Sequence, residues 1–302
     1  MAERLTIAVP FYEGLGYLRI AIESVLAQRR SDWRLIVCDD GEREQGAAEL
    51  VASCGDARIA YCRNPGHLGI ARNWNLCIDR AETELVTLLH ADDRLLPNYV
   101  DLMLDLAERH PGAAALCCAA SIMDADGAAR FSLADAVKRL FVPRGEGPIP
   151  LHGEAALSSL MAGNFIMCPT LCFRRARIGE RRFSEIWKQV LDLEFTARLL
   201  IEGETIVYSR EVAYAYRRHA GGATAIQSES LLRFEEEFGL FELVAARAAE
   251  VGWRRAERVC RRKWIVRLHL LYRALRALLR LQPLRALALL GYAGKRSRKR
   301  GG

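Results

Sequence analysis

The sequence lacks any long uninterrupted run of apolar residues. No stretch approaches the roughly 18 uncharged apolar residues that a membrane-spanning helix requires. The first residues, MAERLTIAVPFYEG, also lack the apolar centre of a signal peptide. The two absences argue against an integral membrane protein and against a secreted one, so we expect a cytoplasmic location.

Metal-type cysteine spacing is also missing, although the sequence has nine cysteines. Cys117 and Cys118 are adjacent, and the others stand alone in apolar runs such as LIVCDD and NLCID. Zinc sites use closely spaced pairs of cysteines, and disulfide frameworks belong to small secreted domains. We therefore expect reduced thiols in the core of a cytosolic protein.

Acidic residues are almost absent from the last part of the sequence. Residues 254–302 contain 16 Lys or Arg and a single acid, Glu257, which gives +15. Residues 1–253 contain 28 basic and 36 acidic residues, which gives −8. This asymmetry predicts an acidic folded body followed by a basic extension that is attracted to anions.

Strand and helix patterns alternate through the first third of the sequence, without an internal repeat. Short apolar runs predict strands, and apolar residues at helical spacing predict helices between them; the strands are 5–9, 34–38, 58–62 and 85–89, and the helices 17–28 and 69–81. This order is typical of a parallel sheet with helices on both faces, in which ligands bind at the carboxyl ends of the strands.

The later part of the sequence predicts a more irregular series of elements. They are a strand at 116–121, a long loop at 124–150, a helix, turn and strand within 155–175, a helix at 186–203, two short strands within 205–219 and a glycine-rich turn at 220–224.

Two pairs of adjacent acids follow predicted strands. Asp39 and Asp40 come after the second strand, and Asp92 and Asp93 come after the fourth. Each pair has a simple interpretation: Asp39 and Asp40 as turn residues before Gly41, and Asp92 and Asp93 as turn residues or as the N-cap of a following helix. Adjacent carboxylates repel each other unless a cation lies between them. Two pairs at one sheet edge favour a site for Mg²⁺ or Mn²⁺ and a diphosphate.

Seven segments together resemble a known family. They are IAVPFYEGLGYLRIAIESVLAQ, RLIVCDDGE, NPGHLGIARNWNLCIDRA, LLHADDRLLP, GNFIMCPTLCFRR, DLEFTARLL and YRRHAGGAT. In this order they resemble the inverting glycosyltransferases of family 2, which have the GT-A fold. The resemblance covers about residues 5–225. It implies an α/β domain over 1–225 with a Rossmann-like mixed sheet flanked by helices, divided into a nucleotide-binding half (1–105) and an acceptor half (106–225). A helical, basic extension would occupy 226–302.

The resemblance also implies which residues bind the donor, a UDP- or dTDP-linked sugar. The expected nucleotide and diphosphate residues are Pro10, Tyr12, Glu13, Asp39, Asp40, Arg72, Asp92 and Asp93, and the expected metal ligands are Asp92 and His219. Glu13 replaces the usual Asn or Asp. His90 stands where the family has the first acid of its DxD motif, which leaves the strength of metal binding open. Arg72 and His219 also have simple interpretations as surface residues.

A catalytic base and an acceptor site follow from the same resemblance. Asp192 matches the base, with an exposed i,i+4 pair to Lys188 as the alternative. Glu194 is a rival base, although on a helix it points about 200° away from Asp192. The expected acceptor residues are Asn164, Pro169 and Arg174. A turn followed by a strand is the alternative for that segment.

The expected reaction moves a sugar to an acceptor hydroxyl with inversion, in the synthesis of a bacterial surface polysaccharide or lipopolysaccharide. Two alternatives stay open: a sugar-1-phosphate nucleotidylyltransferase, which the loop PFYEGLGY disfavours, and a non-catalytic nucleotide-sugar-binding or membrane-scaffold protein. Donor sugar, acceptor, linkage and oligomeric state are not specified by these motifs.

The basic extension contains an amphipathic helix pattern over 261–283. One face carries Trp264, Leu268, Leu271, Leu275 and Leu278, and the other carries Arg262, His269, Arg273, Arg276 and Arg280; Pro283 ends the pattern. Such a helix is typical of attachment to an anionic membrane surface, here the inner face of the cell membrane with a saccharide or lipid-linked acceptor. The alternative is that the leucines pack on the body. Nucleic acid is disfavoured, because the aromatics are few and lie on the apolar face.

Overall fold

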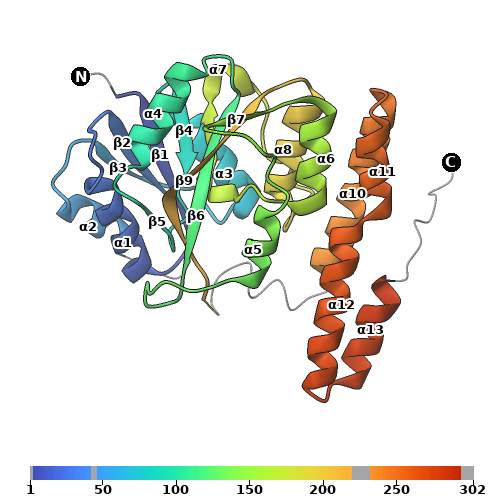
Figure 1. The fold of residues 1–302 in the computed structure, drawn as a ribbon. Helices are drawn as coiled ribbons and strands as arrows, with labels where there is room; N and C mark the ends of the chain where they lie inside the picture. The colour runs from blue at the N-terminus through green and yellow to red at the C-terminus, as the bar shows by residue number, and fades with distance from the viewer. Residues whose placement is uncertain (1–2, 42–45, 220–231, 294–302) are drawn as a thin grey trace.

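The computed structural model describes residues 3–41, 46–219 and 232–293, so the predicted turn at 220–224 lies outside the described residues (Figure 1). One nine-stranded sheet runs through the body in the order β3-β2-β1-β4-β8-β6-β9-β5, and β7 pairs with β9. The strands are β1 (Leu5–Phe11), β2 (Trp33–Asp39), β3 (Ile59–Arg63), β4 (Leu85–Leu88), β5 (Arg94–Leu95), β6 (Ala115–Met123), β7 (Ile149–Leu151), β8 (Cys172–Arg174) and β9 (Ile206–Arg217).

The sheet is parallel in its first half and mixed in its second, as predicted. Strands β1, β2, β3 and β4 run parallel to one another. Strand β8 is antiparallel to both β4 and β6, whereas β6 and β9 are parallel. The helices before the C-terminal group are α1 (Leu15–Leu26), α2 (Ala47–Ser53), α3 (Ile70–Asp79), α4 (Tyr99–Arg109), α5 (Leu133–Arg139), α6 (Gly153–Gly163), the 3₁₀ helix η1 (Cys168–Thr170), α7 (Arg175–Ile178) and α8 (Leu191–Ile201).

Apolar side chains cover both faces of the sheet. In β1, Ile7 and Val9 contribute to the cluster beneath α1, α2 and α4, while Ala8 between them contributes to the cluster beneath α3, α6 and α8. Successive strand residues point to opposite faces, so a strand buried on both sides is a continuous apolar run. The polar residues that follow such a strand then collect at the edge of the sheet.

Two predictions about the second half were wrong in detail. The segment 124–150, predicted as a loop, contains α5 and β7. Both are too short to show a period clearly, and β7 forms by pairing with β9. The segment predicted as two strands is the single strand β9, which pairs with β6 across a register shift. Its exposed residues Arg210 and Glu211 interrupt the apolar pattern at that point.

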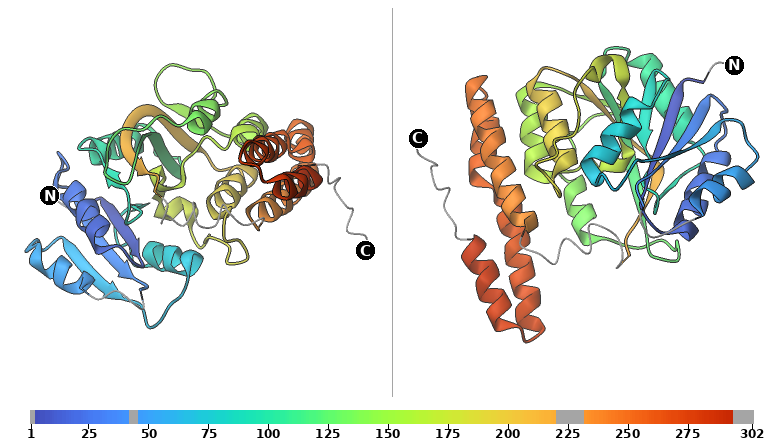
Figure 2. Two further views of the ribbon diagram at one scale, coloured as in Figure 1. Left: turned by 90° about the horizontal axis from the view of Figure 1, so that it is seen from below. Right: turned by 180° about the vertical axis from the view of Figure 1, so that it is seen from behind.

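Four helices form the C-terminal extension, beside α6 and α8 (Figures 1 and 2). They are α10 (Leu232–Glu250), α11 (Arg254–Arg262), α12 (Trp264–Leu279) and α13 (Pro283–Ala293). The predicted continuous helix over 261–283 is therefore wrong, because Lys263 has a left-handed backbone (φ 51°) that ends α11 and begins α12. Its buried ammonium pairs with Glu242. Across the described ranges, no helix is both long and apolar enough to cross a membrane.

Arg174, predicted to border the acceptor, lies elsewhere. Because β8 is antiparallel to β4, Arg174 pairs with Leu85 at the start of β4 and so lies at the edge opposite the ends that carry the acids. Its buried guanidinium donates to the carbonyl oxygens of Ala113 (3.2 Å) and Ala107 (2.8 Å) and pairs with Glu84. The residue ties α4 and β6 to the sheet, and we withdraw it as an acceptor ligand.

We therefore expect Arg174→Met to destabilise the fold without changing substrate affinity. Two buried carbonyl groups lose their charged donor, at a cost of about 2–4 kcal/mol. Urea unfolding measures the loss. The matched control is Arg247→Met, in an exposed pair with Glu250, which should leave stability unchanged. A raised KM for the acceptor with normal stability would restore the original assignment.

Candidate active site

The carboxyl ends of β1, β2 and β4 bring the two acid pairs to one edge of the sheet. Phe11 at the end of β1 is in register with Asp39 at the end of β2, and the Asp40 N–H donates to the Phe11 carbonyl at 2.8 Å. On the other side of β1, Leu89 N–H donates to Ala8. Asp92 and Asp93 follow Leu89 by three and four residues, so they lie just beyond the last bond between β4 and β1.

Hydrogen bonds from the protein hold the Asp39–Asp40 pair. Asp40 accepts from the N–H groups of Leu68 (2.8 Å) and Gly69 (2.9 Å) and from Asn64 Nδ2 (2.9 Å). Asp39 accepts from Gly41 N–H, Tyr61 Oη and Arg63 Nη1 at 2.9, 2.6 and 2.6 Å. Three donors compensate each buried carboxylate. Asp40 thus fixes the shape of the loop before α3, and Asp39 ties the end of β2 to β3.

Two exposed aromatic side chains, Tyr12 and His67, lie next to the Asp39–Asp40 pair. The Tyr12 ring lies 5.0 Å from the ring of His67, whose Nδ1 is 3.0 Å from Asp40. Pro10 is half-buried within β1, and Glu13 is exposed. Sequence reasoning did not single out His67, although it lies in the quoted segment NPGHLGIA. Together Tyr12 and His67 offer a platform on which a planar base can stack.

The second pair belongs to a compact group of potential metal ligands. Atoms of His90, Asp92 and Asp93 lie within 4.8 Å of one another. Asp92 Oδ2 is also 2.9 Å from His219 Nε2, so the two predicted ligands are in direct contact. The structure thus brings together residues that are 127 positions apart. Of the simple interpretations, the turn agrees with the structure, which has a turn at Ala91 and Asp92, whereas the helix N-cap is wrong, because β5 follows the acids and Asn98 stands at the N-cap position of α4.

Asp93 differs from Asp92 in its surroundings. Its fully buried carboxylate accepts from Tyr214 Oη (2.9 Å) and from the N–H of Arg217 (2.7 Å), both in β9. Burial raises the pKa of Asp93 well above its ordinary value, and the charge of Asp92 raises it further. Asp93 therefore anchors β9 to the segment after β4. The partly exposed Asp92 is the acid that can meet a ligand.

The donor set suits a divalent cation. The buried Nε2 of His90 has no hydrogen-bond partner within the described part of the chain, and burial lowers the pKa of this imidazole. A neutral imidazole beside carboxylates can ligate a metal ion.

Asp192 lies in the first turn of α8, half-buried. Burial raises the pKa of its carboxyl above 3.8, while its own N–H, that of Leu193 and the charge of Lys138 oppose the rise. The same carboxylate acts on Cys168 in η1: burial raises the pKa of that thiol, and the charges of Asp192 and Asp93 add to the rise.

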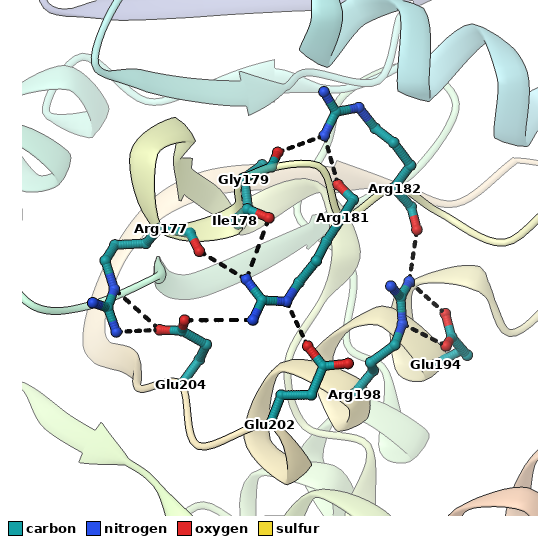
Figure 3. A network of polar contacts seen from close by, with 9 residues as sticks. All are labelled: Arg177, Ile178, Gly179, Arg181, Arg182, Glu194, Arg198, Glu202 and Glu204. Carbon is teal, nitrogen blue, oxygen red and sulfur yellow. Dashed lines mark hydrogen bonds and ion pairs between the residues drawn. The ribbon is translucent and has the colours of Figure 1, made fainter.

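The carboxylate of the rival base, Glu194, is engaged in an ion pair. Its carboxylate pairs with Arg198 at 2.8 and 3.2 Å, and Arg198 also donates to the carbonyl of Arg182 at 2.6 Å (Figure 3). Figure 3 shows the two residues within a network of arginines and glutamates between α7 and α8. No ion pair joins Asp192 to Lys188 in the described ranges; the Lys188 N–H donates to Glu236 instead. Of the two acids, only Asp192 is available as a base.

The remaining predicted site residues are Arg72, Asn164 and Pro169. Arg72 makes an exposed pair with Glu185 at 2.7 Å, and among the described residues it forms no ion pair with either of the two aspartate pairs. Asn164 adopts a left-handed backbone (φ 43°) at the end of α6. Pro169 is buried in η1, next to Cys168. Asn164 and Pro169 thus lie at the two ends of the connection between α6 and η1, and their acceptor role stays a prediction.

Comparison with known proteins now identifies the family. The family model described as "Glycosyl transferase family 2" matches residues 6–167, which include every acid of the two pairs. The chain belongs to glycosyl transferase family 2. The prediction of a family-2 glycosyltransferase is confirmed, and the alternative of a nucleotidylyltransferase is set aside.

Curated relatives share this region to different extents. The chain is 28% identical over 236 residues to the succinoglycan biosynthesis protein ExoW of Rhizobium meliloti, covering 76% of this chain and 70% of that protein. It is 26% identical to an uncharacterized protein of Mycobacterium tuberculosis (71% and 67% covered). An uncharacterized glycosyltransferase of Rickettsia conorii is 32% identical over 106 residues, but the match spans only 17% of that protein.

Solved structures confirm the GT-A fold. The S. aureus TarS 1-349 complex with UDP-GlcNAc superposes with a TM-score of 0.63 at 16% identity, covering 86% of this chain and 70% of that one. The mannosyltransferase PcManGT from Pyrobaculum calidifontis, in complex with GDP-Man and Mn²⁺, gives 0.61 at 14% identity, covering 97% and 86%.

The different surroundings of the two adjacent acids predict different effects on substitution. Asp93→Ala leaves two buried donors in β9 without an acceptor and should lower the free energy of unfolding by about 2–4 kcal/mol. Asp92→Ala should change stability little but remove the stabilisation that Mn²⁺ gives together with UDP. Thermal unfolding with and without these ligands separates the two. Equal Mn²⁺ responses in the wild type and Asp92→Ala would show that Asp92 is not a ligand.

Proposed function

We propose that this chain is a metal-dependent inverting glycosyltransferase that uses a UDP- or dTDP-linked sugar. The observation that carries the proposal is the group of potential ligands after β4, where atoms of His90, Asp92 and Asp93 lie within 4.8 Å of one another and Asp92 Oδ2 lies 2.9 Å from His219 Nε2. The names of its relatives, succinoglycan biosynthesis and a UDP-GlcNAc complex, support a role in surface polysaccharide synthesis. We also propose residues 1–225 as the catalytic domain, in halves 1–105 and 106–225, and 226–302 as its extension.

The residues divide the chemical work as follows. Asp192 accepts the proton of the acceptor hydroxyl, whose oxygen attacks the anomeric carbon as the bond to the diphosphate breaks on the opposite face. Tyr12, with Asp40 and His67 beneath it, positions the nucleotide base. Asp92 with His90 or His219 would hold Mg²⁺ or Mn²⁺, which supplies Lewis-acid neutralisation of the diphosphate. Asp39 and Asp93 maintain the loops on which these groups stand.

The pH profile tests the base. Asp192 accepts a proton only when ionised, and burial raises its pKa, so kcat should rise with pH through a value above 3.8. Asp192→Asn should lower kcat by about 10²–10⁴ and remove the acidic limb. Glu194→Gln is the matched control on the same helix and should retain the limb. An unchanged limb in Asp192→Asn would assign the base elsewhere.

Donor hydrolysis tests the transferase itself. The wild type with Mn²⁺ should release UDP or dTDP slowly from a nucleotide-sugar without acceptor, and chelation should stop the release. If none of a panel of nucleotide-sugars yields a nucleoside diphosphate while binding persists, the non-catalytic alternative is correct.

We further propose that α12 and α13 attach the enzyme to an anionic membrane surface. The side chains predicted on one face, from Trp264 to Leu278, are all exposed, whereas Val266, Leu270 and Ala274 face the body. The interpretation in which the leucines pack on the body is therefore wrong. Leu281 (89% exposed) and Leu284 (82%) continue the apolar surface where the two helices join. Large apolar patches mark interaction sites, and the neighbouring exposed arginines favour an anionic bilayer as the partner.

Vesicle sedimentation tests the attachment. The full chain should bind vesicles of phosphatidylcholine with phosphatidylglycerol better than phosphatidylcholine alone, and Leu275→Gln with Leu278→Gln should weaken binding by roughly tenfold or more. The control is Leu243→Gln, an exposed leucine on α10. Failure to bind either vesicle, with the chain dimeric in solution, would assign the apolar face to a second copy.

A further inference from the structure

The segment before α8 determines where the proposed base stands. Residues 183–190, all within the described part of the chain, form turns and bends, and α8 begins after them at Leu191. Asp192 is the second residue of that helix. Its place in the site therefore depends on what holds residues 183–190, which we call the base loop.

The end of the base loop is attached to α10, the first helix of the C-terminal extension. Val190 stands at the N-cap position of α8, and its apolar side chain cannot accept a hydrogen bond. The acceptor for this part of the chain is the carboxylate of Glu236. The Lys188 N–H lies 3.0 and 2.9 Å from its two oxygens, and the Gln189 N–H donates to it at 2.7 Å.

The surroundings of Glu236 make this attachment strong. Its side chain is buried, so the carboxylate needs donors from the protein, and hydrogen bonds to a charged group are stronger than neutral ones. Next to these bonds, the Trp187 ring packs over Gly239, where a Cβ would lie 3.4 Å from the ring. Polar and apolar contacts together fix the end of the base loop to α10.

The start of the base loop is attached to α3, in the other half of the body. Asn75 Nδ2 donates to the carbonyl of Phe183 at 2.9 Å, and the Phe183 N–H donates to Asn75 Oδ1 at 2.8 Å. The neighbouring Trp74 ring lies 5.1 Å from the Phe183 ring and 5.2 Å from the ring of His90. One turn of α3 thus contacts both the base loop and the group of potential metal ligands.

The two attachments come from different sides of α8. This helix lies between α3 and the C-terminal helices, and α10 packs directly against it (Figures 1 and 2). A shift of the base loop would break hydrogen bonds to Asn75, to Glu236 or to both. Because rates are sensitive to the placement of a reacting group at the level of about 1 Å, such attachments bear on the reaction.

We propose that Glu236 and Asn75 are positioning residues that set the place of Asp192 relative to the donor site. The inference rests on the proposed function, in which Asp192 is the base. Both side chains act through the backbone of the base loop and not on the substrate. The C-terminal extension then has a part in the reaction, through Glu236, that is separate from membrane attachment.

Amide hydrogen exchange on the full chain tests the attachments without any substrate. Glu236→Ala and Asn75→Ala should each speed exchange in a peptide that covers residues 183–192, by about tenfold or more. Glu236→Gln keeps one acceptor oxygen and should show a smaller increase. Exchange in this peptide should not change in two control variants on α10: Glu237→Gln, whose carboxylate pairs with Arg233, and Val244→Ala, at a buried position.

Donor hydrolysis with Mn²⁺, in which water replaces the acceptor, tests the positioning role. Glu236→Ala and Asn75→Ala should lower kcat by about 10- to 100-fold, because the base is displaced, and leave the KM for the donor unchanged. The acidic limb of the pH profile should remain, since Asp192 is still the base. Glu237→Gln should keep the kcat of the wild type. Val244→Ala should also keep it, even where this variant lowers the Tm as much as Glu236→Ala.

Each other outcome has a definite meaning. Unchanged exchange in the peptide, or faster exchange with the kcat of the wild type, overturns the inference. An equal loss of kcat in Val244→Ala also overturns it, because general loosening of the extension would then be the cause. Loss of the acidic limb in Glu236→Gln would make Glu236 itself the base. Faster exchange in variants of a wild type that hydrolyses no donor would confirm the attachments but reject the proposed function, and with it the positioning role.

Discussion

The arrangement of the site depends on one buried carboxylate. Asp93 receives hydrogen bonds from Tyr214 and the Arg217 N–H and thereby joins the segment after β4 to the end of β9. Arg217 returns a second bond, from its Nε to the carbonyl of Asp92 at 2.6 Å. Because His219 follows two residues later, these bonds bring it to Asp92. A metal site assembled from distant segments needs such an internal tie, since each ligand alone stands on a loop.

Burial explains why two adjacent acids have different roles. In Asp93, desolvation and the neighbouring charge raise the pKa, and the protein compensates with donors from β9. Asp92 keeps access to solvent and to His219. The same division recurs at the end of β2, where Asp39 receives its donors from β3 and Asp40 from the loop before α3. In both pairs the carboxylates are held by the fold before any ligand binds, which is the preorganisation that catalysis requires.

The sequence predicted the sheet edge and its acids well, because strands buried on both faces are continuous apolar runs and their ends are marked by polar residues. It failed where position depends on strand direction. Arg174 follows a proline-containing turn in the expected order, but the antiparallel course of β8 carries it to the opposite edge. His67 lay within a quoted segment, and only its neighbours in space, Tyr12 and Asp40, show its relevance.

The basic extension has two faces with different chemistry, which the net charge of the segment did not reveal. On α12 the residues Val266, Leu270, Ala274 and Ala277 pack inward, and the other leucines face outward. Small inward residues let the helix approach the body closely, so that His269 and Arg273 reach the ring of Phe234 on α10. One helix can therefore hold to the body with one face and leave its outer leucines for the bilayer contact proposed above. Because the two faces are separate, substitution of the outer leucines tests that contact without disturbing the packing of the helix on the body.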